Sequence, residues 1–319
     1  MSAVAIVHPS TLLGKELRER FDARPDLALD VRLFSTDEEE VGTVTEVGGA
    51  AAFVNRWSEA IVDEIDLALF CGDLERDREA VRILPPSTRG LMLSSGASLE
   101  DGAPAVAGLN ERLWLSRPRL SSPAPATLLI ARLLEPLAMA RPREISATAF
   151  LAVSDLGQEA LNGLLDETRA LLSLSSVRKS KHFPAKVAFN LFPGILSGAE
   201  VERQLSALFG EAAPALAVQT LQAGLFHGVA VSMNLRVDKS IGAAGLRGLL
   251  AKSDALTLVR QPARLGTLDA AGADRILVGD IRESAAGTLW LWATMDNLAI
   301  GAANAVALTA ALLESGPPA

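Results

Sequence analysis

The sequence is short of several residue types, and each shortage excludes a kind of chemistry. Its single cysteine, Cys71, rules out a disulfide framework within the chain and disfavours a cysteine-based metal cluster. The three histidines, at positions 8, 182 and 227, share no metal-ligand spacing, so we expect no bound metal. Tyrosine is absent and aromatic residues make up only 4%, so the core must be built mainly from alanine, leucine and valine.

The chain also has fewer basic than acidic residues, 30 against 38. The net charge of −8 disfavours binding to nucleic acid or to an anionic membrane. The first ten residues, "MSAVAIVHPS", lack the basic and apolar regions of a signal peptide, and the apolar run at 305–313 is too short to cross a bilayer. We therefore expect a cytoplasmic protein. The basic run "RKSKHFPAK" at 178–186 predicts a solvated loop or, alternatively, a site for phosphate or an acidic partner.

The first third of the chain alternates between short apolar runs and segments with helical spacing. A helix pattern at 10–22 follows a Ser/Thr cap. The strand-like runs are 3–9, 27–35, 50–55, 66–72, 90–95 and 103–110. This alternation predicts a doubly wound, Rossmann-type parallel sheet.

From about residue 143 the pattern changes to long strands with fewer helices. The strand-like segments are 143–154, 186–193, two runs within 216–238, and 275–284 with 288–297, which we expect to be antiparallel neighbours. Helices are expected at 156–173 and at about 300–314. The sequence predicts a mixed α+β domain whose sheet is covered on one face.

The turn at 8–14, "HPSTLLG", lies where a nucleotide-binding turn belongs, between the first strand and the first helix. Only Gly14 remains of the expected glycines, and Pro9 has no N–H, so an ordinary turn is favoured over a phosphate site. Cys71, at the end of a predicted strand, is interpreted as a small buried apolar group rather than a cleft residue. His227 lies in a strand-like run, which favours a structural role.

Four segments, in this order, resemble the aspartate-semialdehyde dehydrogenase family. They are "GLMLSSGASLEDGAPAVAGLN" at 90–110, "AFLAVSDLGQEALNGLLDET" at 149–168, "HFPAKVAFNLFPGI" at 182–195 and "LWLWATMDNLAIGAAN" at 289–304. The resemblance implies a glyceraldehyde-3-phosphate dehydrogenase-like fold. It divides the chain into a dinucleotide-binding domain (1–128 with 298–319) and a catalytic-like dimerisation domain (129–297). It also implies a homodimer through the second domain's sheet, and NADP-dependent chemistry through a cysteine thioester.

The resemblance also shows where the family's functional residues should lie. Its nucleophile motif "SNPNCST" matches "SSPAPAT" at 121–127, which puts Pro125 at the cysteine position. The other expected catalytic positions carry Leu151, Gln222 and Val229, and a substrate-binding arginine position carries Leu99. The residues matched to cofactor-binding positions are Ser10, Thr11, Leu12, Gly14 and Asn297.

Three hypotheses follow from these matches. The first is a catalytically degenerate relative, similar to the Usg-type paralogues, with a binding, scaffolding or regulatory role and little affinity for NADP. The second is an enzyme with relocated chemistry built from Cys71, His227 and the run 178–186. The third is an active NADP-dependent semialdehyde dehydrogenase of amino-acid biosynthesis whose catalytic residues lie elsewhere in the sequence.

Overall fold

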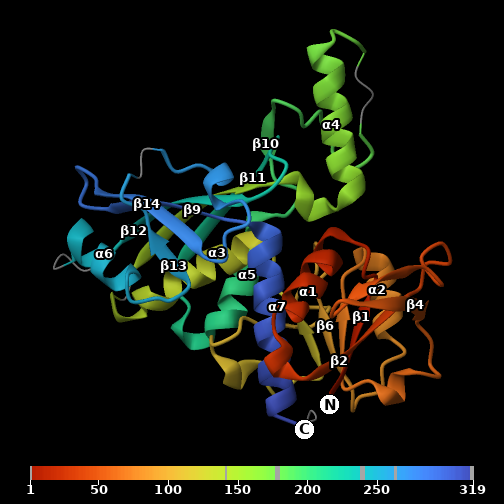
Figure 1. Cartoon of the computed structure of the whole chain (residues 1–319). Coiled ribbons are helices and arrows are strands. Elements are labelled where there is room, and N and C mark those ends of the chain that lie inside the picture. Colours follow the sequence, from red (N-terminus) through yellow and green to blue (C-terminus); the bar gives the residue numbers. More distant parts are fainter. Residues whose placement is uncertain (1, 141, 177–179, 238–240, 262–263, 317–319) are drawn as a thin grey trace. The chain divides into compact units, whose positions relative to one another are not determined.

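The computed structural model describes residues 2–140, 142–176, 180–237, 241–261 and 264–316, and it divides the chain into two compact units (Figure 1). The first unit comprises Met1–Ala124 and Gly301–Ala319, and the second comprises Pro125–Ile300. The whole of helix α3 (Pro125–Leu134) therefore belongs to the second unit, whereas the boundary expected after residue 128 would divide it.

The first unit is built on an eight-stranded sheet with the order β3-β4-β2-β1-β5-β6-β8-β7. Strand β1 lies near the middle of this sheet. All the pairings are parallel except that of β3 with β4, which form an antiparallel hairpin at one edge. The strands are β1 (Ser2–Val7), β2 (Leu29–Ser35), β3 (Val44–Val47), β4 (Ala50–Arg56), β5 (Leu67–Phe70), β6 (Arg89–Met92), β7 (Ala103–Pro104) and β8 (Arg119–Ser121).

Helices cover both faces of this sheet, as expected for a doubly wound fold. One face packs against α1 (Leu12–Asp22) and the later part of α7 (Asn297–Glu314), and the other face packs against α2 (Leu74–Val81). Single 3-10 turns connect the elements: η1 (Pro25–Leu27), η2 (Val62–Glu64) and η3 (Glu111–Leu113). The predicted Rossmann-type fold is confirmed for this unit.

Several predicted strands of this unit are shorter than the sequence pattern indicated, and in two of them left-handed residues turn the chain. The run at 103–110 is extended only over Ala103–Pro104, because left-handed residues at Gly108 and Asn110 turn the chain. The run at 27–35 begins its strand at Leu29, after a left-handed Ala28. Apolar patterning alone does not reveal these changes of backbone conformation.

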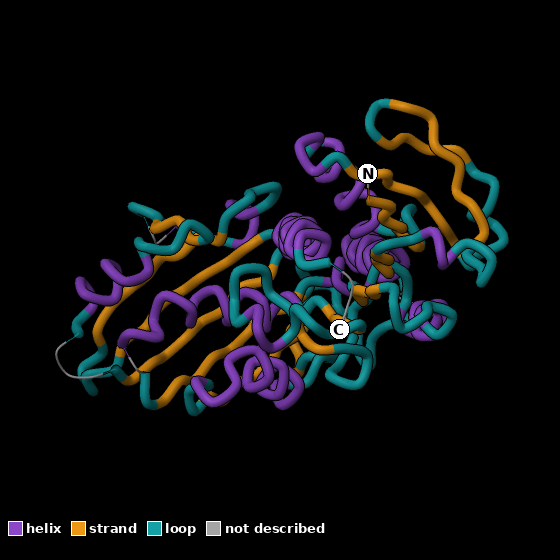
Figure 2. The backbone as a smooth tube through the Cα atoms, turned by 90° about the horizontal axis from the view of Figure 1, so that it is seen from below, coloured by secondary structure: helices purple, strands orange, loops and turns teal. Residues whose placement is uncertain are grey.

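The second unit contains a seven-stranded mixed sheet with the order β10-β11-β9-β12-β15-β14-β13. Its long strands run side by side (Figure 2). They are β9 (Glu144–Leu151), β10 (Leu191–Pro193), β11 (Leu216–Ala223), β12 (Val229–Arg236), β13 (Leu256–Leu258), β14 (Ile276–Glu283) and β15 (Leu289–Met295). The antiparallel pairing of β14 with β15 confirms the sequence prediction.

Helices cover one face of this sheet and leave the other face open. Helix α3 packs on β9, β12 and β15, α5 (Gly198–Phe209) packs on β11, and α6 (Ala243–Leu250) packs on β13 and β14. Helix α4 (Gln158–Leu172) follows β9. The short turns are η4 (Glu135–Ala140), η5 (Val153–Leu156), η6 (Gly210–Ala212) and η8 (Thr267–Ala270). The open face keeps alternate side chains half-exposed: Thr148, Phe150, Ser232, Asn234, Trp290 and Trp292.

Two further expectations need correction. The strand expected at 186–193 extends only over Leu191–Pro193, because Phe189 takes a left-handed φ of 55°. The apolar run at 305–313, judged too short for a membrane span, is part of the 18-residue helix α7, which is long and apolar enough by length and composition. More than half of that window is buried, as in the core helix of a folded domain.

Candidate functional site

The turn between β1 and α1 lies at the carboxyl end of the central strand, where Rossmann-type folds bind a pyrophosphate. His8 has a φ of 63°, a conformation that glycine adopts more readily. The hydroxyl of Thr11 accepts a hydrogen bond from the Gly14 N–H (3.1 Å) and donates one to the His8 carbonyl (3.1 Å). A Cβ on Gly14 would lie 2.8 Å from the carbonyl oxygens of His8 and Pro9. The one retained glycine therefore lets the helix pack closely on the turn.

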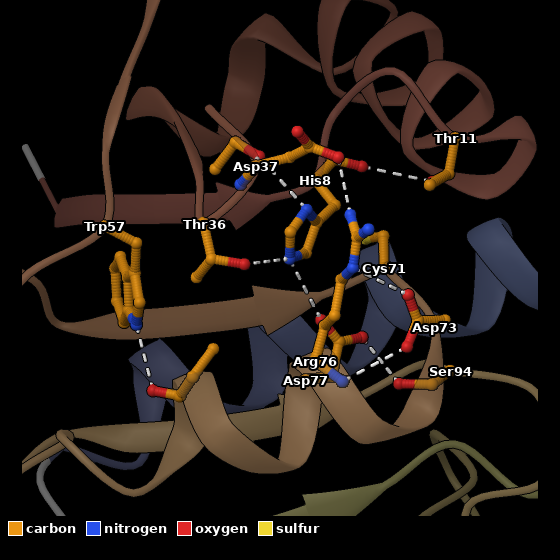
Figure 3. Close-up of polar contacts among 12 residues, drawn as sticks. His8, Thr11, Thr36, Asp37, Trp57, Cys71, Asp73, Arg76, Asp77 and Ser94 are labelled. Carbon is orange, nitrogen blue, oxygen red and sulfur yellow. Dashed lines mark hydrogen bonds and ion pairs between the residues drawn. The ribbon is translucent and has the colours of Figure 1, made fainter. Parts of the chain in front are cut away.

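The buried imidazole of His8 contacts residues at the end of β2 and beyond the ends of β2 and β5 (Figure 3). Its Nδ1 lies 3.1 Å from Ser35 Oγ, and its Nε2 lies 3.2 Å from Thr36 Oγ1 and 3.6 Å from Asp77 Oδ1. A Cβ on Gly72 would lie 2.5 Å from His8 Cδ2. The imidazole ring is therefore packed directly against the chain at the carboxyl end of β5.

Asp77, on α2, is fully buried beside this ring. Its Oδ2 accepts a hydrogen bond from the Ser94 hydroxyl (2.6 Å), but its Oδ1 has no hydrogen-bond partner among the described residues. Burial raises the pKa of Asp77 to about 7, although the Ser94 hydrogen bond and the nearby His8 act in the opposite direction. Asp77 therefore exchanges its proton near neutral pH.

Glu40, five residues after the end of β2, places its carboxylate at the beginning of α1. The backbone N–H of Ser10 donates to its Oε1 (2.9 Å), and its Oε2 lies 3.6 Å from His8 Nδ1. Burial raises the pKa of Glu40, but hydrogen bonds from His8, Ser10 and Ser35 outweigh that effect and lower it to about 2. Glu40 is therefore an anion at neutral pH.

The structure brings four of the predicted cofactor residues together in this turn. The N–H of Ser10 is bonded to Glu40, Thr11 and Gly14 are bonded to each other, and Leu12 begins α1. Contact between these residues and a cofactor stays a prediction. Among the residues that the structure describes, no group of histidine, cysteine, aspartate and glutamate is arranged to hold a metal.

Cys71, directly after β5, belongs to the hydrophobic core of the first unit, and only 5% of its surface is exposed. Burial raises the pKa of its thiol well above the ordinary value, and the negative charges of Asp77 and Glu40 raise it further. Reactive cysteines need the opposite environment, one that is electropositive and accessible.

Pro125 is the first residue of α3, in the second unit. Proline suits this position, because its ring fixes a helical φ and the first helical N–H has no partner within the helix. The following turn is buried, and the Thr127 hydroxyl donates to Gln204 Oε1 (2.7 Å). The residue at the expected nucleophile position therefore serves helix initiation.

The other predicted catalytic positions meet at one end of the second sheet. Leu151 and Gln222 are register partners on β9 and β11, and Val229 opens the neighbouring strand β12. The Gln222 side-chain amide donates to the Leu151 carbonyl (3.1 Å), and all three side chains are buried. The structure thus groups these positions but gives them two apolar side chains and one amide bonded to the backbone.

Asn297 begins α7 and links three segments of the second unit. Its Oδ1 accepts from the Gly228 N–H (2.8 Å), and its Nδ2 donates to Ser154 Oγ (3.0 Å) and Asp155 Oδ1 (3.2 Å). This buried network joins η5, the β11–β12 loop and the start of α7. The side-chain amide predicted to face a cofactor is thus hydrogen-bonded within the protein.

His227 is not in a strand, contrary to the sequence interpretation. It is exposed in the loop at 224–228, because the chain leaves β11 through this loop and reaches β12 after Gly228, whose φ is 89°. Leu99, at the expected substrate-arginine position, is 39% exposed in a loop of the first unit.

The described part of the basic run 178–186 is partly paired with an acidic residue on α4. Lys181 Nζ lies 2.7 Å from Glu159 Oε2, and His182 Nε2 lies 3.4 Å from the same oxygen. Arg178 and Lys179 lie outside the described residues. The Lys181 pair is exposed, so its contribution to stability is small.

A Rossmann-type unit combined with an α+β unit whose sheet has one open face defines a class of two-domain dehydrogenase-like proteins. Residues 134–300 match the family model described as "Semialdehyde dehydrogenase, dimerisation domain". This match covers just over half of the chain and all but the first helix of the second unit. The chain belongs to the aspartate-semialdehyde dehydrogenase family.

Individual relatives agree with this assignment. The chain is 30% identical to a USG-1 protein homolog from Azotobacter vinelandii over 243 residues, which are 70% of this chain and 71% of the relative. It is 23% identical to an aspartate-semialdehyde dehydrogenase from Rickettsia conorii, with 98% of each chain covered. The solved structure of a probable aspartate-semialdehyde dehydrogenase from Pseudomonas aeruginosa superposes with a TM-score of 0.87, at 25% identity and 98% coverage of each chain.

Sequence reasoning missed Glu40, Asp77 and Ser94, although a signal was present. Ser94 lies just beyond β6, Asp77 lies on the helix that follows β5, and Glu40 ends the acidic run 37–40 after β2. Residues that follow parallel strands gather at the carboxyl edge of the sheet, where ligands bind in this fold.

Proposed function

We propose that the protein is a catalytically inactive member of the aspartate-semialdehyde dehydrogenase family with a binding, scaffolding or regulatory role. Pro125 carries this proposal. A thioester requires a sulfur nucleophile, which proline lacks, and proline also has no backbone N–H to stabilise an oxyanion. Loss of one member of a catalytic unit commonly costs several powers of ten in rate.

The surroundings of the other candidate residues support the same proposal. Leu151 and Val229 have no proton to transfer, and the amide of Gln222 is bonded to the Leu151 carbonyl. Cys71 is a poor replacement nucleophile, because burial and two neighbouring carboxylates stabilise its thiol over the thiolate. These observations weigh against an enzyme that has moved its chemistry to Cys71.

The test is phosphate-dependent formation of NADPH from aspartate semialdehyde by the purified protein, with an active family enzyme as the positive control. We expect no turnover above background. Turnover that persists through further purification would contradict the proposal. In that case Cys71→Ser identifies its source: loss of the activity would assign the chemistry to a relocated thiol, and retention would assign it to residues elsewhere.

The second unit is also proposed to form a homodimer through the open face of its sheet. The family model that matches this unit is a dimerisation domain. The open face presents Phe150 and Trp292, with ring centroids 5.8 Å apart, and Trp290 beneath the Arg282 guanidinium at 5.6 Å. The Trp292 indole N–H is buried without a hydrogen-bond partner among the described residues. A second copy would cover these rings.

Sedimentation equilibrium tests the assembly directly. We expect twice the chain mass for the wild-type protein and the mass of one chain for Trp292→Arg, because a charge would be buried in the interface. Phe53→Arg is the matched control, since Phe53 is another exposed aromatic side chain (63%) and lies on β4 of the first unit, outside this sheet. A monomeric wild type would contradict the assembly, as would a Trp292→Arg variant that remains dimeric.

A further inference from the structure

The cofactor that the family resemblance implies is NADP, and the turn after β1 is where its pyrophosphate would lie. In this fold the phosphates approach the N-terminus of the first helix, where backbone N–H groups and the helix dipole stabilise negative charge. The residues present here do not fit that group. The N–H of Ser10 already donates to Glu40 Oε1 at 2.9 Å, and the N–H of Gly14 already donates to the Thr11 hydroxyl at 3.1 Å.

The Glu40 carboxylate has the features of a bound anion at this position. It is largely buried, with 14% of its side chain exposed, and it contacts both the Ser10 N–H, two residues before α1, and the His8 ring. His8 Nδ1 lies 3.6 Å from its Oε2. A carboxylate and a phosphate compete for the same donors, so the protein supplies from its own chain the negative charge that a nucleotide would bring.

The His8 ring fills the space beside that anion. It is the first residue of the turn "HPSTLLG" at 8–14, where a nucleotide-binding turn has a glycine, and it keeps a glycine-like φ of 63°. Its ring packs at the carboxyl end of β5 so closely that a Cβ on Gly72 would lie 2.5 Å from Cδ2. Only 3% of His8 is exposed. The crevice at the carboxyl ends of β1 and β5, where ligands bind in open α/β sheets, therefore contains protein atoms.

The negative charge around the turn also disfavours binding of NADP. The residues after Thr36 are Asp37, Glu38, Glu39 and Glu40. In Rossmann-type sites an arginine near this position accommodates the 2′-phosphate of NADP. Here Arg76 is paired with Asp37 (2.6 Å) and Asp73 (3.2 Å), and Arg56 is paired with Glu38. A 2′-phosphate would therefore meet a predominantly negative loop.

We propose that the nucleotide site of the first unit is closed from within: the Glu40 carboxylate, held by His8 and the Ser10 N–H, occupies the phosphate position and excludes NADP. The proposal deepens the proposed function and rests on the family's Rossmann-type fold. Its test measures binding and requires no turnover. The turnover assay tests whether the protein is inactive, and calorimetry tests separately whether the nucleotide site is closed.

Isothermal titration calorimetry with NADP, NAD and inorganic pyrophosphate tests the closed site. Wild-type protein should show no binding up to millimolar ligand. The double variant His8→Gly with Glu40→Ala removes the ring and the carboxylate from the crevice, and glycine at position 8 suits the left-handed φ. It should bind pyrophosphate at least about tenfold more tightly than wild type. Glu38→Ala removes an equal charge from the same loop at a side chain that is 67% exposed, and it should bind like wild type.

Three results would overturn the proposal: micromolar binding of NADP by wild type, a folded double variant that binds pyrophosphate no better than wild type, or an equal gain in Glu38→Ala. Circular dichroism and thermal melting establish that each variant is folded. If the double variant does not fold, Glu40→Gln replaces it, because glutamine preserves the side-chain volume and removes only the charge. A gain in pyrophosphate affinity for Glu40→Gln supports the closed site, and no gain refutes it.

Discussion

Each unit contains a buried polar cluster beside the ends of its strands, and the two clusters are built differently. In the first unit, His8, Asp77 and Glu40 are ionisable, and Asp77 Oδ1 has no hydrogen-bond partner among the described residues. In the second unit, the amide of Asn297 bonds a hydroxyl, a backbone N–H and a carboxylate oxygen. The amide carries no charge at any ordinary pH, whereas burying an ionisable carboxyl couples stability to protonation. Asp155 is such a carboxyl in the second cluster, because burial raises its pKa to about 6 although the hydrogen bond from Asn297 lowers it. The first cluster should therefore respond to pH up to about 7 and the second only up to about 6, with the larger response in the first.

The same contrast separates retained motif residues from replaced ones. Gly14 and Asn297 match the family motifs, and each has a packing or hydrogen-bonding role within its unit. The family resemblance assigns the first position of the nucleotide turn to contact with a ligand, and the nucleophile position to contact with a substrate. This chain has His8 at the first and Pro125 at the second. This difference is what the proposed loss of catalysis predicts: residues with a role in the fold are kept, and positions assigned to a ligand or substrate carry other residues.

The largest effect that sharpens this contrast is the pH dependence conferred by Asp77. Its pKa is 3.8 in the unfolded chain and about 7 in the folded protein, so between these values the folded protein binds more protons than the unfolded chain. The free energy of unfolding therefore falls as pH rises from about 4 to 7 and is constant above that. The full effect is a few kcal/mol, at most about 4.

Asp77→Asn removes this pH dependence while keeping an oxygen that can accept the Ser94 hydroxyl. Relative to wild type, the variant should gain stability between pH 5 and pH 8, measured as the difference in melting temperature at each pH. Asn297→Ala leaves the buried Gly228 N–H unpaired and removes the hydrogen bond that lowers the pKa of Asp155, so it should instead lose about 1–3 kcal/mol, with the larger loss at pH 8. Asp166→Asn, at a side chain that is 78% exposed, is the control for charge alone. A difference between Asp77→Asn and wild type that stays constant with pH would break the contrast.

Much of the fold follows from the sequence, because burial imposes regular patterns. The short apolar runs of the first unit predicted its doubly wound fold, and the long strand-like segments of the second unit predicted its α+β fold. The errors lie where single residues change the backbone, such as the left-handed Phe189 that shortens the strand expected at 186–193. Hydrophobic patterns report which side chains are buried, and they do not report a positive φ at one residue.

The functional positions were predictable only in part. The matches placed Leu151, Gln222 and Val229 in three distant segments, and the structure brings them to one end of a sheet. The internal anion at Glu40 was missed, because it depends on a contact between residues 10 and 40 that no local pattern encodes. The missing glycines showed that the turn had changed, but they could not show what replaced the ligand.

The smallest expected effect concerns the glycine that the nucleotide turn kept. In Gly14→Ala the new Cβ would lie 2.8 Å from two backbone carbonyl oxygens, which cannot move aside as a flexible side chain would. We expect a loss of about 1–3 kcal/mol from this overpacking, measured by urea denaturation. Gly248→Ala is the matched control, because Gly248 also lies in a helix but a Cβ there meets nothing within 4 Å. That variant should gain up to about 1 kcal/mol from helix propensity. Opposite signs for the two substitutions would assign Gly14 to close packing of the helix on the turn, whereas equal gains would mean that the fold does not require it and that its retention reflects a ligand.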